Sequence, residues 1–232
     1  MKVLGLDFET TGLEAQSARV IEIGAVVWDT DKSKPLAVMS ELVLPEELTE
    51  VPTEIVKVTG IETDDLENFG LEPKKAFQRL NFYLSQCDYV MAHNAEFDKS
   101  FYLQEISRHG LDVVEKPWLD SMYDVPYPEE LSTRKLGHLA ADHGFVNPWS
   151  HRALFDVMTM LQIVSKYDFH EVIERSQSPV VTVISHVSFE EKDKAKQMGF
   201  RWDPKNKKWF KDYKHCDLMN MDFPFEYSLL EQ

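Results

Sequence analysis

The sequence predicts an α/β domain, built on a mixed β-sheet that helices flank, and a small α+β domain after it. Apolar and β-branched stretches lead the chain, and helix-like patterns follow them with some alternation. A polar segment, Arg175 to Pro179, then precedes a new β-branched run. The residues beyond it are rich in lysine and aromatic side chains. We therefore expect two domains, of residues 1–175 and 176–232.

The first strands are predicted from runs of valine, isoleucine and leucine. Such runs occupy Lys2 to Phe8, Arg19 to Trp28 and Ala37 to Leu44. Because these three segments follow one another closely, they predict an antiparallel meander. A shorter strand is expected at Tyr89 to Ala92, directly before a helical pattern, and this alternation favours a mixed sheet.

Helical patterns occupy much of the chain between the third strand and the polar segment. The expected helices are Thr53 to Val58, Lys74 to Ser85, Glu96 to Arg108, Ser132 to Asp142 and Ala153 to Lys166. Gly110 and Gly144 follow the third and fourth of them and are expected to end those helices. In the last helix, Leu154, Val157 and Leu161 fall on one stripe, as in a helix with one buried face.

The small second domain is expected to begin with a strand at Val180 to Ile184. Ser188 to Glu191 fits a capping box in front of a short basic helix that ends at Gly199. Trp202 and Trp209 flank a turn sequence with proline at its second position, which predicts a compact hairpin. The remaining tail has no clear period and carries no structural prediction.

The composition excludes several classes of protein. With 232 residues, 43% hydrophobic and 28% charged, the chain has the composition of an ordinary globular protein. It lacks an apolar stretch of the signal-peptide or membrane-spanning kind, so we expect a cytoplasmic protein without a membrane partner. Its two cysteines, Cys87 and Cys216, stand far apart, which argues against a disulfide framework or a zinc site.

The net charge of −15 is unusual for a protein that handles nucleic acid, whose phosphates are normally contacted by lysine and arginine. The charge is unevenly distributed along the chain. Between Glu190 and Lys214 there are nine basic and five acidic residues, a local net charge of +4, which leaves −19 for the remainder. Part of this acidic excess is a candidate metal site, whose cations would offset several charges.

Acidic side chains end the first predicted strand in a pattern that suits metal binding. Asp7 and Glu9 are two residues apart in a strand, so both carboxylates point to the same face. Two like charges held this close repel each other unless divalent cations neutralise them. A strand that ends in a solvated acidic turn would explain Asp-x-Glu alone. Two further segments make the metal site the stronger interpretation.

These segments are His93 to Asp98 and His151 to Asp156, and they add two carboxylates and a histidine. Carboxylates without cysteine suit Mg²⁺ or Mn²⁺. Two such ions stabilise the entering and leaving oxygens of a displacement at phosphorus, and histidine is a common general base at neutral pH. As alternatives, the start of a helix favours a carboxylate at Asp156 by itself, and a lone loop histidine is usually a surface residue.

Together the three segments resemble the motifs of the DnaQ-like DEDDh family of 3′-5′ exonucleases, which includes exonuclease X and polymerase proofreading subunits. The resemblance covers residues 2 to 167 and implies a ribonuclease H-like fold. It implies that Asp7 bridges two Mg²⁺ or Mn²⁺ ions. Glu9 and Asp156 complete the site of the ion that holds the attacking water, and Asp98 serves the second ion. His151 takes a proton from the water.

The resemblance also assigns substrate contacts. It implies that the stretch after the metal strand lines the pocket of the terminal nucleotide, and this stretch consists of Thr10, Thr11, Gly12 and Leu13. An ordinary glycine turn is the alternative. His93 and Asn94 lie near the substrate by resemblance, or serve only the end of their strand. Asp120 is expected to have a structural or capping role, and Phe97 to pack in the core.

The basic and aromatic segment of the second domain resembles a short accessory domain that is appended to DNA-processing enzymes such as primases. Its side chains are suited to grip phosphates and stack on unpaired bases. The candidate contacts are Lys192, Lys196, Arg201, Trp202, Lys207, Lys208 and Trp209. In the alternative, the aromatic residues form the core of a tiny domain and the lysines only solvate it.

The sequence thus predicts a metal-dependent 3′-5′ exonuclease that acts on DNA, on single strands or 3′ ends, and releases nucleoside 5′-monophosphates. Nucleic acid is its expected partner, together with replication or repair proteins. Three alternatives stay open: an RNA-trimming exoribonuclease, a non-catalytic nucleic-acid-binding subunit, and an endonuclease. The intact set of five site residues argues against the non-catalytic subunit, because a binding protein gains little from buried clustered charge.

Overall fold

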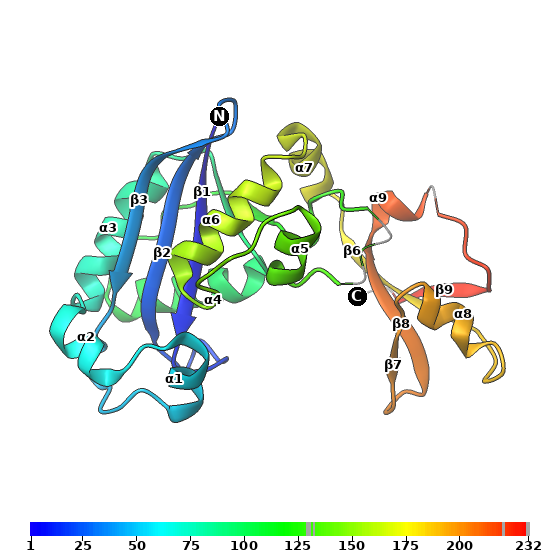
Figure 1. Cartoon of the computed structure of the whole chain (residues 1–232), viewed down its shortest axis with the longest axis horizontal. Coiled ribbons are helices and arrows are strands. Elements are labelled where there is room, and N and C mark those ends of the chain that lie inside the picture. The colour runs from blue at the N-terminus through cyan, green and yellow to red at the C-terminus, as the bar shows by residue number, and fades with distance from the viewer. Residues whose placement is uncertain (129–130, 132, 220, 231–232) are drawn as a thin grey trace. The chain divides into compact units, whose positions relative to one another are not determined.

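The computed structural model describes residues 1–128, 131, 133–219 and 221–230. Its contacts divide the chain into two compact units, whose elements are labelled in Figure 1. The first unit comprises Met1–Met122 and Thr133–Phe169, and the second comprises Tyr123–Ser132 and His170–Gln232. Whether each unit folds by itself, as a domain with the boundary predicted after Arg175, stays a prediction.

A five-stranded mixed sheet forms the centre of the first unit, in the order β3-β2-β1-β4-β5. Its strands are β1 (Lys2–Thr10), β2 (Val20–Asp29), β3 (Lys34–Leu42), β4 (Tyr89–Ala92) and β5 (Trp118–Asp120). The first three pair antiparallel, and β4 and β5 extend the sheet in parallel from β1. The predicted α/β class, meander and mixed sheet are confirmed. The sequence missed β5, because three residues are too few to show a period.

The helices of the first unit are α1 (Thr53–Thr59), α2 (Thr63–Phe69), α3 (Pro73–Ser85), α4 (Ala95–Arg108), α5 (Leu136–Asp142) and α6 (Ala153–Val164). The sequence missed α2, which buries only Leu66. The helix predicted from Ser132 to Asp142 is shorter than expected. Lys135 is extended, so α5 begins after it. Ser132 lies outside the described residues. Among the described residues, no helix combines the length and apolar character that crossing a bilayer requires.

The two faces of β1 have different roles, because successive side chains of a strand point to opposite sides. Leu4 and Phe8 are buried in the main core with side chains of α3 and α4. The opposite face meets α6, since a Cβ on Gly5 would lie 2.7 Å from a side-chain carbon of that helix. Figure 1 shows α6 across one face of the sheet, with α3 and α4 behind the other. Asp7 and Glu9 share the face of Gly5 and therefore point to the side of α6.

The first turn of α6 is clamped onto β2. Gly24 leaves no room for a side chain, since a Cβ there would lie 2.3 Å from the carbonyl carbon of Ala153. Buried Glu22 accepts hydrogen bonds from the Arg152 guanidinium (2.8 Å) and from the Ala153 N–H (2.9 Å). Because β1 and β2 pair Asp7 with Gly24, this clamp fixes the start of α6 beside the predicted metal ligands.

The second unit is built on a four-stranded sheet in the order β7-β8-β6-β9. Its strands are β6 (Val180–Ser185), β7 (Arg201–Asp203), β8 (Lys208–Lys214) and β9 (Tyr227–Leu230). The helices in this part of the chain are α7 (Phe169–Ser176), α8 (Lys192–Gln197) and α9 (His215–Leu218). Strand β6 and the β7-β8 hairpin confirm the corresponding predictions. The core of the unit is formed by Val183, Ala195, Phe200 and Tyr213.

Local contacts explain two further features of the second unit. The predicted capping box is met in part: the Ser188 hydroxyl accepts the backbone N–H of Glu191 (3.3 Å), but α8 begins only at Lys192, after a turn. Arg175, at the predicted boundary, belongs to α7. Its guanidinium pairs with the carboxylate of Asp217 and donates to the carbonyl of Asp124.

Candidate active site

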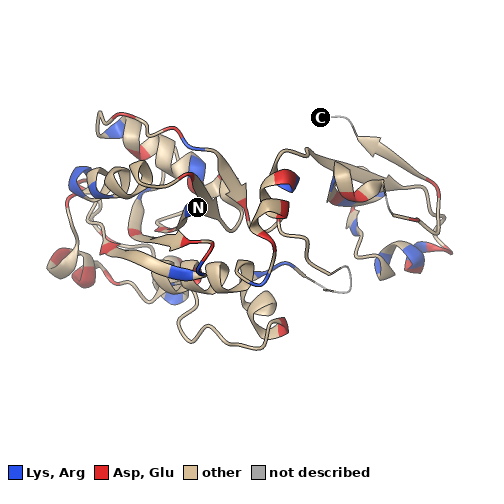
Figure 2. Ribbon diagram, turned by 90° about the horizontal axis from the view of Figure 1, so that it is seen from above, with Lys and Arg blue, Asp and Glu red and all other residues tan. Residues whose placement is uncertain are grey.

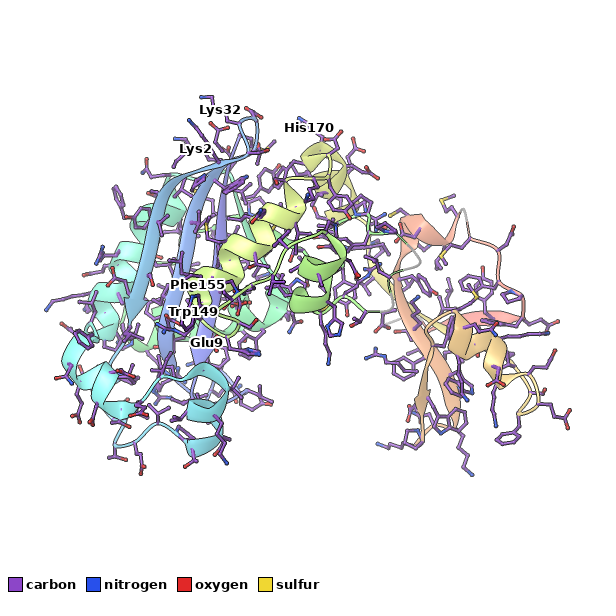
Figure 3. The ribbon with its side chains drawn as sticks, in the orientation of Figure 1. Lys2, Glu9, Lys32, Trp149, Phe155 and His170 are labelled. Atoms are coloured by element: carbon purple, nitrogen blue, oxygen red, sulfur yellow. The ribbon has the colours of Figure 1, made fainter. Side chains whose placement is uncertain are left out.

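The five predicted catalytic residues come from three parts of the first unit and lie together. Asp7 and Glu9 stand at the end of β1. Asp98, in the first turn of α4, is buried, and its carboxylate accepts a hydrogen bond (3.1 Å) from the backbone N–H of Phe8, which lies between Asp7 and Glu9 in β1. Ligand atoms of Glu9, His151 and Asp156 lie within 4.8 Å of one another. Figure 3 shows Glu9 at this end of the sheet.

Asp120 fixes the start of the helix that carries Asp98. Its carboxylate accepts hydrogen bonds from the N–H groups of Asn94 and Ala95, each at 3.1 Å. N–H groups at the start of a helix have no partner within the helix, so a carboxylate there stabilises it. Asn94 has a φ of 75°, a left-handed conformation that asparagine tolerates. The capping role predicted for Asp120 is confirmed.

The loop before α6 wraps around the carboxylate of Asp156. One oxygen accepts the backbone N–H of His151 (2.8 Å), and the other accepts the side-chain amide of Asn147 (2.6 Å). His151 has a φ of 62°, so the chain turns sharply where its imidazole leaves the loop. Nothing in the sequence pointed to Asn147, because asparagine before proline is typical of an ordinary turn.

Burial raises the pKa of all four carboxyl groups, and repulsion by neighbouring carboxylates adds to this effect. The pKa of Asp7 lies well above its ordinary range, first because of burial and then because of Asp98 and Glu9. Burial, followed by the charge of Asp156, raises the pKa of Glu9 to about 8. Burial also raises the pKa of Asp98 and Asp156. A cluster that is destabilised by its own negative charge attracts cations.

The donor atoms of this cluster fit hard divalent cations. Four carboxylates supply oxygen ligands, the type that Mg²⁺ and Mn²⁺ prefer, and no cysteine stands among the five residues. The side chains of Glu9, His151 and Asp156 converge closely enough for their ligand atoms to share one ion or its bound water. The cofactor predicted from the sequence therefore fits the residues that the fold brings together.

The last residue of β1 and the stretch that follows it form a tight turn next to the cluster. The Thr10 hydroxyl donates to the carbonyl of Gly12 (2.6 Å), and the Thr11 hydroxyl accepts a backbone N–H (2.9 Å). Leu13 is 83% exposed at the tip of this turn. Arg108, which the sequence did not single out, donates to the carbonyls at positions 15 and 16 and so ties the turn to α4. The turn therefore presents Leu13 to solvent on a fixed backbone.

His93 is held by partners within the first unit. Its two ring nitrogens contact the Ser121 hydroxyl and the Arg134 carbonyl, each at 2.8 Å. Burial lowers its pKa. These contacts explain His93 as a structural residue at the end of β4, whereas Asn94 is exposed. Contact of either residue with substrate stays a prediction. Phe97 packs against the core, as expected, and its ring is tilted against that of Phe101, with centroids 4.8 Å apart.

Comparisons of the sequence with known proteins agree with this geometry. Residues 4–164 match the exonuclease family RNase T, and residues 186–215 match a domain of unknown function, DUF5710. DNA polymerase III subunit epsilon of Treponema pallidum is 28% identical over 187 residues, which cover 75% of this chain and 83% of that protein. DNA polymerase III PolC-type of Lactococcus lactis is 32% identical over 155 residues, 65% of this chain.

Solved structures share the fold. A complex of Escherichia coli exonuclease I with single-stranded DNA has a TM-score of 0.63 at 16% identity and covers 79% of this chain. The nuclease domain of 3′hExo, a DEDDh family member bound to rAMP, has a TM-score of 0.58 at 17% identity; 71% of this chain and 90% of that one are covered. The chain spans only 9% of the PolC-type polymerase and 48% of exonuclease I.

Proposed function

Because the chain belongs to the exonuclease family RNase T, which it matches over residues 4–164, we propose that it removes nucleotides one at a time from the 3′ ends of single-stranded DNA. The observation that carries this proposal is the convergence of Glu9, His151 and Asp156, beside half-buried Asp7 and buried Asp98, at one end of the sheet. Such a set of carboxylates and one imidazole suits hydrolysis at phosphorus.

Each residue of the cluster has a distinct task in this proposal. Asp7, Glu9, Asp98 and Asp156 hold two Mg²⁺ or Mn²⁺ ions, which when bound supply positive charge to the reacting phosphate oxygens. His151 accepts a proton from the attacking water, whose oxygen forms the new bond to phosphorus. The bond from phosphorus to the 3′ oxygen breaks. The products are a nucleoside 5′-monophosphate and a strand with a new 3′ hydroxyl.

The neighbouring turn is proposed to receive the terminal nucleotide. Its residues are Thr10, Thr11, Gly12 and Leu13, and the exposed side chain of Leu13 is available to the last bases. His93 and Asn94, next to the start of α4, are the further candidates. The rigid anchoring of this turn by Arg108 supports the proposal, because a fixed backbone orients a substrate with little loss of entropy.

DNA is the proposed substrate because the relatives named above are DNA polymerase III proteins and exonuclease I was solved with single-stranded DNA. The same relatives lead us to propose a cytoplasmic protein that works with replication or repair proteins. RNA is the second candidate, favoured by the likeness to the nuclease domain of 3′hExo, which was solved with rAMP.

Digestion of matched DNA and RNA strands tests the proposal. The strands carry a label at the 5′ end and are incubated with the chain and Mg²⁺, Mn²⁺ or a chelator. We expect a ladder that shortens from the 3′ end, free 5′-monophosphates and no reaction with chelator. Shortening from the 5′ end, or cutting of circular single strands, would contradict the proposal. Faster digestion of RNA would select the second candidate.

The second unit is proposed to raise the affinity for nucleic acid. Figure 2 shows lysine and arginine on α8 and on strand β8. Trp202 is 47% exposed and pairs with Trp209 across the hairpin, with ring centroids 5.4 Å apart. Lys196 lies 5.8 Å above the Trp209 ring. Trp209 packs partly against the core of the second unit, so a purely structural role would explain Trp209. Such a role does not explain Trp202, which is not among the residues of that core.

Replacing Lys192, Lys196 and Lys208 together by alanine is expected to weaken the salt dependence of DNA binding. Each lysine that neutralises one phosphate of a single strand adds about 0.7 to the slope of log affinity against log salt, so removing three such lysines changes the slope by roughly 2. Fluorescence anisotropy across a salt series measures the slope. Single-turnover cleavage at saturating enzyme should not change, because the lysines lie outside the carboxylate cluster.

A matched control removes three exposed lysines of the first unit and consists of Lys32, Lys57 and Lys74, each replaced by alanine. It lowers the net charge by the same amount, so any general electrostatic effect appears in both triple variants. An equal change of slope in both variants, or no change in either, would exclude the second unit from binding.

A further inference from the structure

Two large aromatic side chains are exposed beside the carboxylate cluster. Trp149 is 60% exposed and Phe155 is 40% exposed, and their ring centroids lie 6.3 Å apart at an angle of 49°. Figure 3 labels both rings in the part of the first unit where it labels Glu9. Large aromatic residues are mostly buried in folded proteins, so an exposed pair indicates a surface that binds something.

The chain itself places this pair next to the cluster. Trp149 precedes His151 by two residues, so their Cα atoms are at most about 7 Å apart. Phe155 directly precedes Asp156 in the first turns of α6. Each ring therefore belongs to a residue within two positions of a proposed catalytic residue in the sequence. A strand whose terminal phosphate lies at the cluster has its last bases within reach of these rings.

The pair is held by the same contacts that hold the cluster. Asn147 accepts the backbone N–H of Trp149 (3.0 Å) through its side-chain oxygen. Its amide nitrogen donates to the Asp156 carboxylate (2.6 Å). One side chain thus fixes both the loop that carries Trp149 and a proposed metal ligand. A surface that is ordered before binding loses little entropy when a ligand stacks on it.

The charges around the pair select the kind of ligand. The loop from Gly144 to Ser150 contains no lysine or arginine, so the ring pair itself offers no cation to a phosphate group. The faces of two aromatic rings instead suit a flat, neutral ring system. Resting on the proposed function, we propose that Trp149 and Phe155 form a stacking platform for a nucleobase near the 3′ end of the single-stranded substrate.

Strands with single abasic sites test this platform. Trp149→Ala is expected to raise KM on an intact strand roughly 5- to 150-fold, the range of one base stacked on an aromatic ring. An abasic site is then placed at the first, second or third position from the 3′ end. When the abasic site is at the position that stacks, KM of the wild type should rise by the same factor. Trp149→Ala should then raise KM no further on that strand. Trp149→Phe keeps a ring and should restore most of the affinity.

The outcomes separate this inference from the proposed function. If wild type does not shorten 3′ ends, the proposed function fails. If wild type does so and Trp149→Ala has the same KM, the platform alone is excluded. A penalty that persists at all three abasic positions would also exclude it, since the substitution would then act through the structure of the loop. Thermal unfolding of each variant identifies any loss of folding.

Discussion

Replacing Asp7 by asparagine is expected to abolish cleavage while the fold is kept. Asp7 is half-buried at the end of β1, close to the charges of Asp98 and Glu9, and its proposed task is to hold both cations. The amide has nearly the same shape but no negative charge. Because bound metal ions contribute several kcal/mol to the stability of the transition state, the single-turnover rate should fall on the order of 10³-fold or more. Rapid-quench assays with saturating Mn²⁺ measure this rate.

When metal is absent, Asp7→Asn should stabilise the folded chain, although it abolishes cleavage. The raised pKa of Asp7 means that its charged form is less favourable in the folded chain than in the unfolded chain, so the charge destabilises the fold above the unfolded-state pKa. At neutral pH, Asp7→Asn removes this penalty, and Tm in chelator should rise. Saturating Mn²⁺ should raise Tm of wild type by roughly 5 to 10 °C at 100 times Kd. The variant should lose most of that gain.

Asp112→Asn provides the matched control, since Asp112 is exposed and is distant in the sequence from each of the proposed ligands. It should leave both the rate and the response to Mn²⁺ unchanged. If Asp7→Asn cleaves like wild type, the site assignment is wrong. If it loses activity but still gains full stability from Mn²⁺, then Asp7 acts in catalysis without holding the ion.

The first strand shows how far the sequence leads towards this site. A run of apolar residues predicted β1, and the spacing of Asp7 and Glu9 placed both carboxylates on one face, as the structure shows. The period of a strand is local, so it can be read from the chain alone. The convergence of Asp98 and Asp156 with this strand is not local. Only the family resemblance predicted it.

The residues that produce this convergence were the ones that the sequence did not identify. Glu22 carried a signal, since it is a single carboxylate inside the apolar run of β2 and turned out to be buried. A buried carboxylate requires a partner, but the sequence does not say that the partner is Arg152. Asn147 and Arg108 act through loop backbones whose course depends on the fold. Short elements such as β5 were missed because neighbouring strands, rather than their own sequence, stabilise them.

Replacing Gly24 by alanine is expected to disrupt both the fold and the site. The new Cβ would lie 2.3 Å from the carbonyl carbon of Ala153 and 2.4 Å from the backbone nitrogen of Leu154. These are backbone atoms, which cannot rotate away, so the start of α6 must move outward by roughly 1 Å to reach normal contact distance. Overpacking of this kind costs about 1–3 kcal/mol or more in the free energy of unfolding. Chemical denaturation measures this cost.

The displacement also predicts a loss of activity that unfolding does not explain. The start of α6 carries Asp156 and is bonded to Glu22 through Arg152, so its movement separates Asp156 from Glu9. A shift of about 1 Å between reacting groups can lower the rate roughly 10²-fold. Single-turnover assays at a temperature where the variant is fully folded isolate this loss from the effect on stability.

Two other glycines of the first unit separate the effect of position from the effect of the substitution. Gly137 lies in α5, and a Cβ there would meet nothing within 4 Å, so Gly137→Ala should keep full activity and add up to about 1 kcal/mol of stability. Gly5→Ala would meet only side chains of α6, which can rotate, so its effects should be intermediate. If Gly24→Ala instead resembles Gly137→Ala in both readouts, α6 does not position the site through this contact. The order Gly24, Gly5, Gly137 in lost activity would show that the backbone contact between β2 and α6 holds Asp156 against the carboxylates of β1.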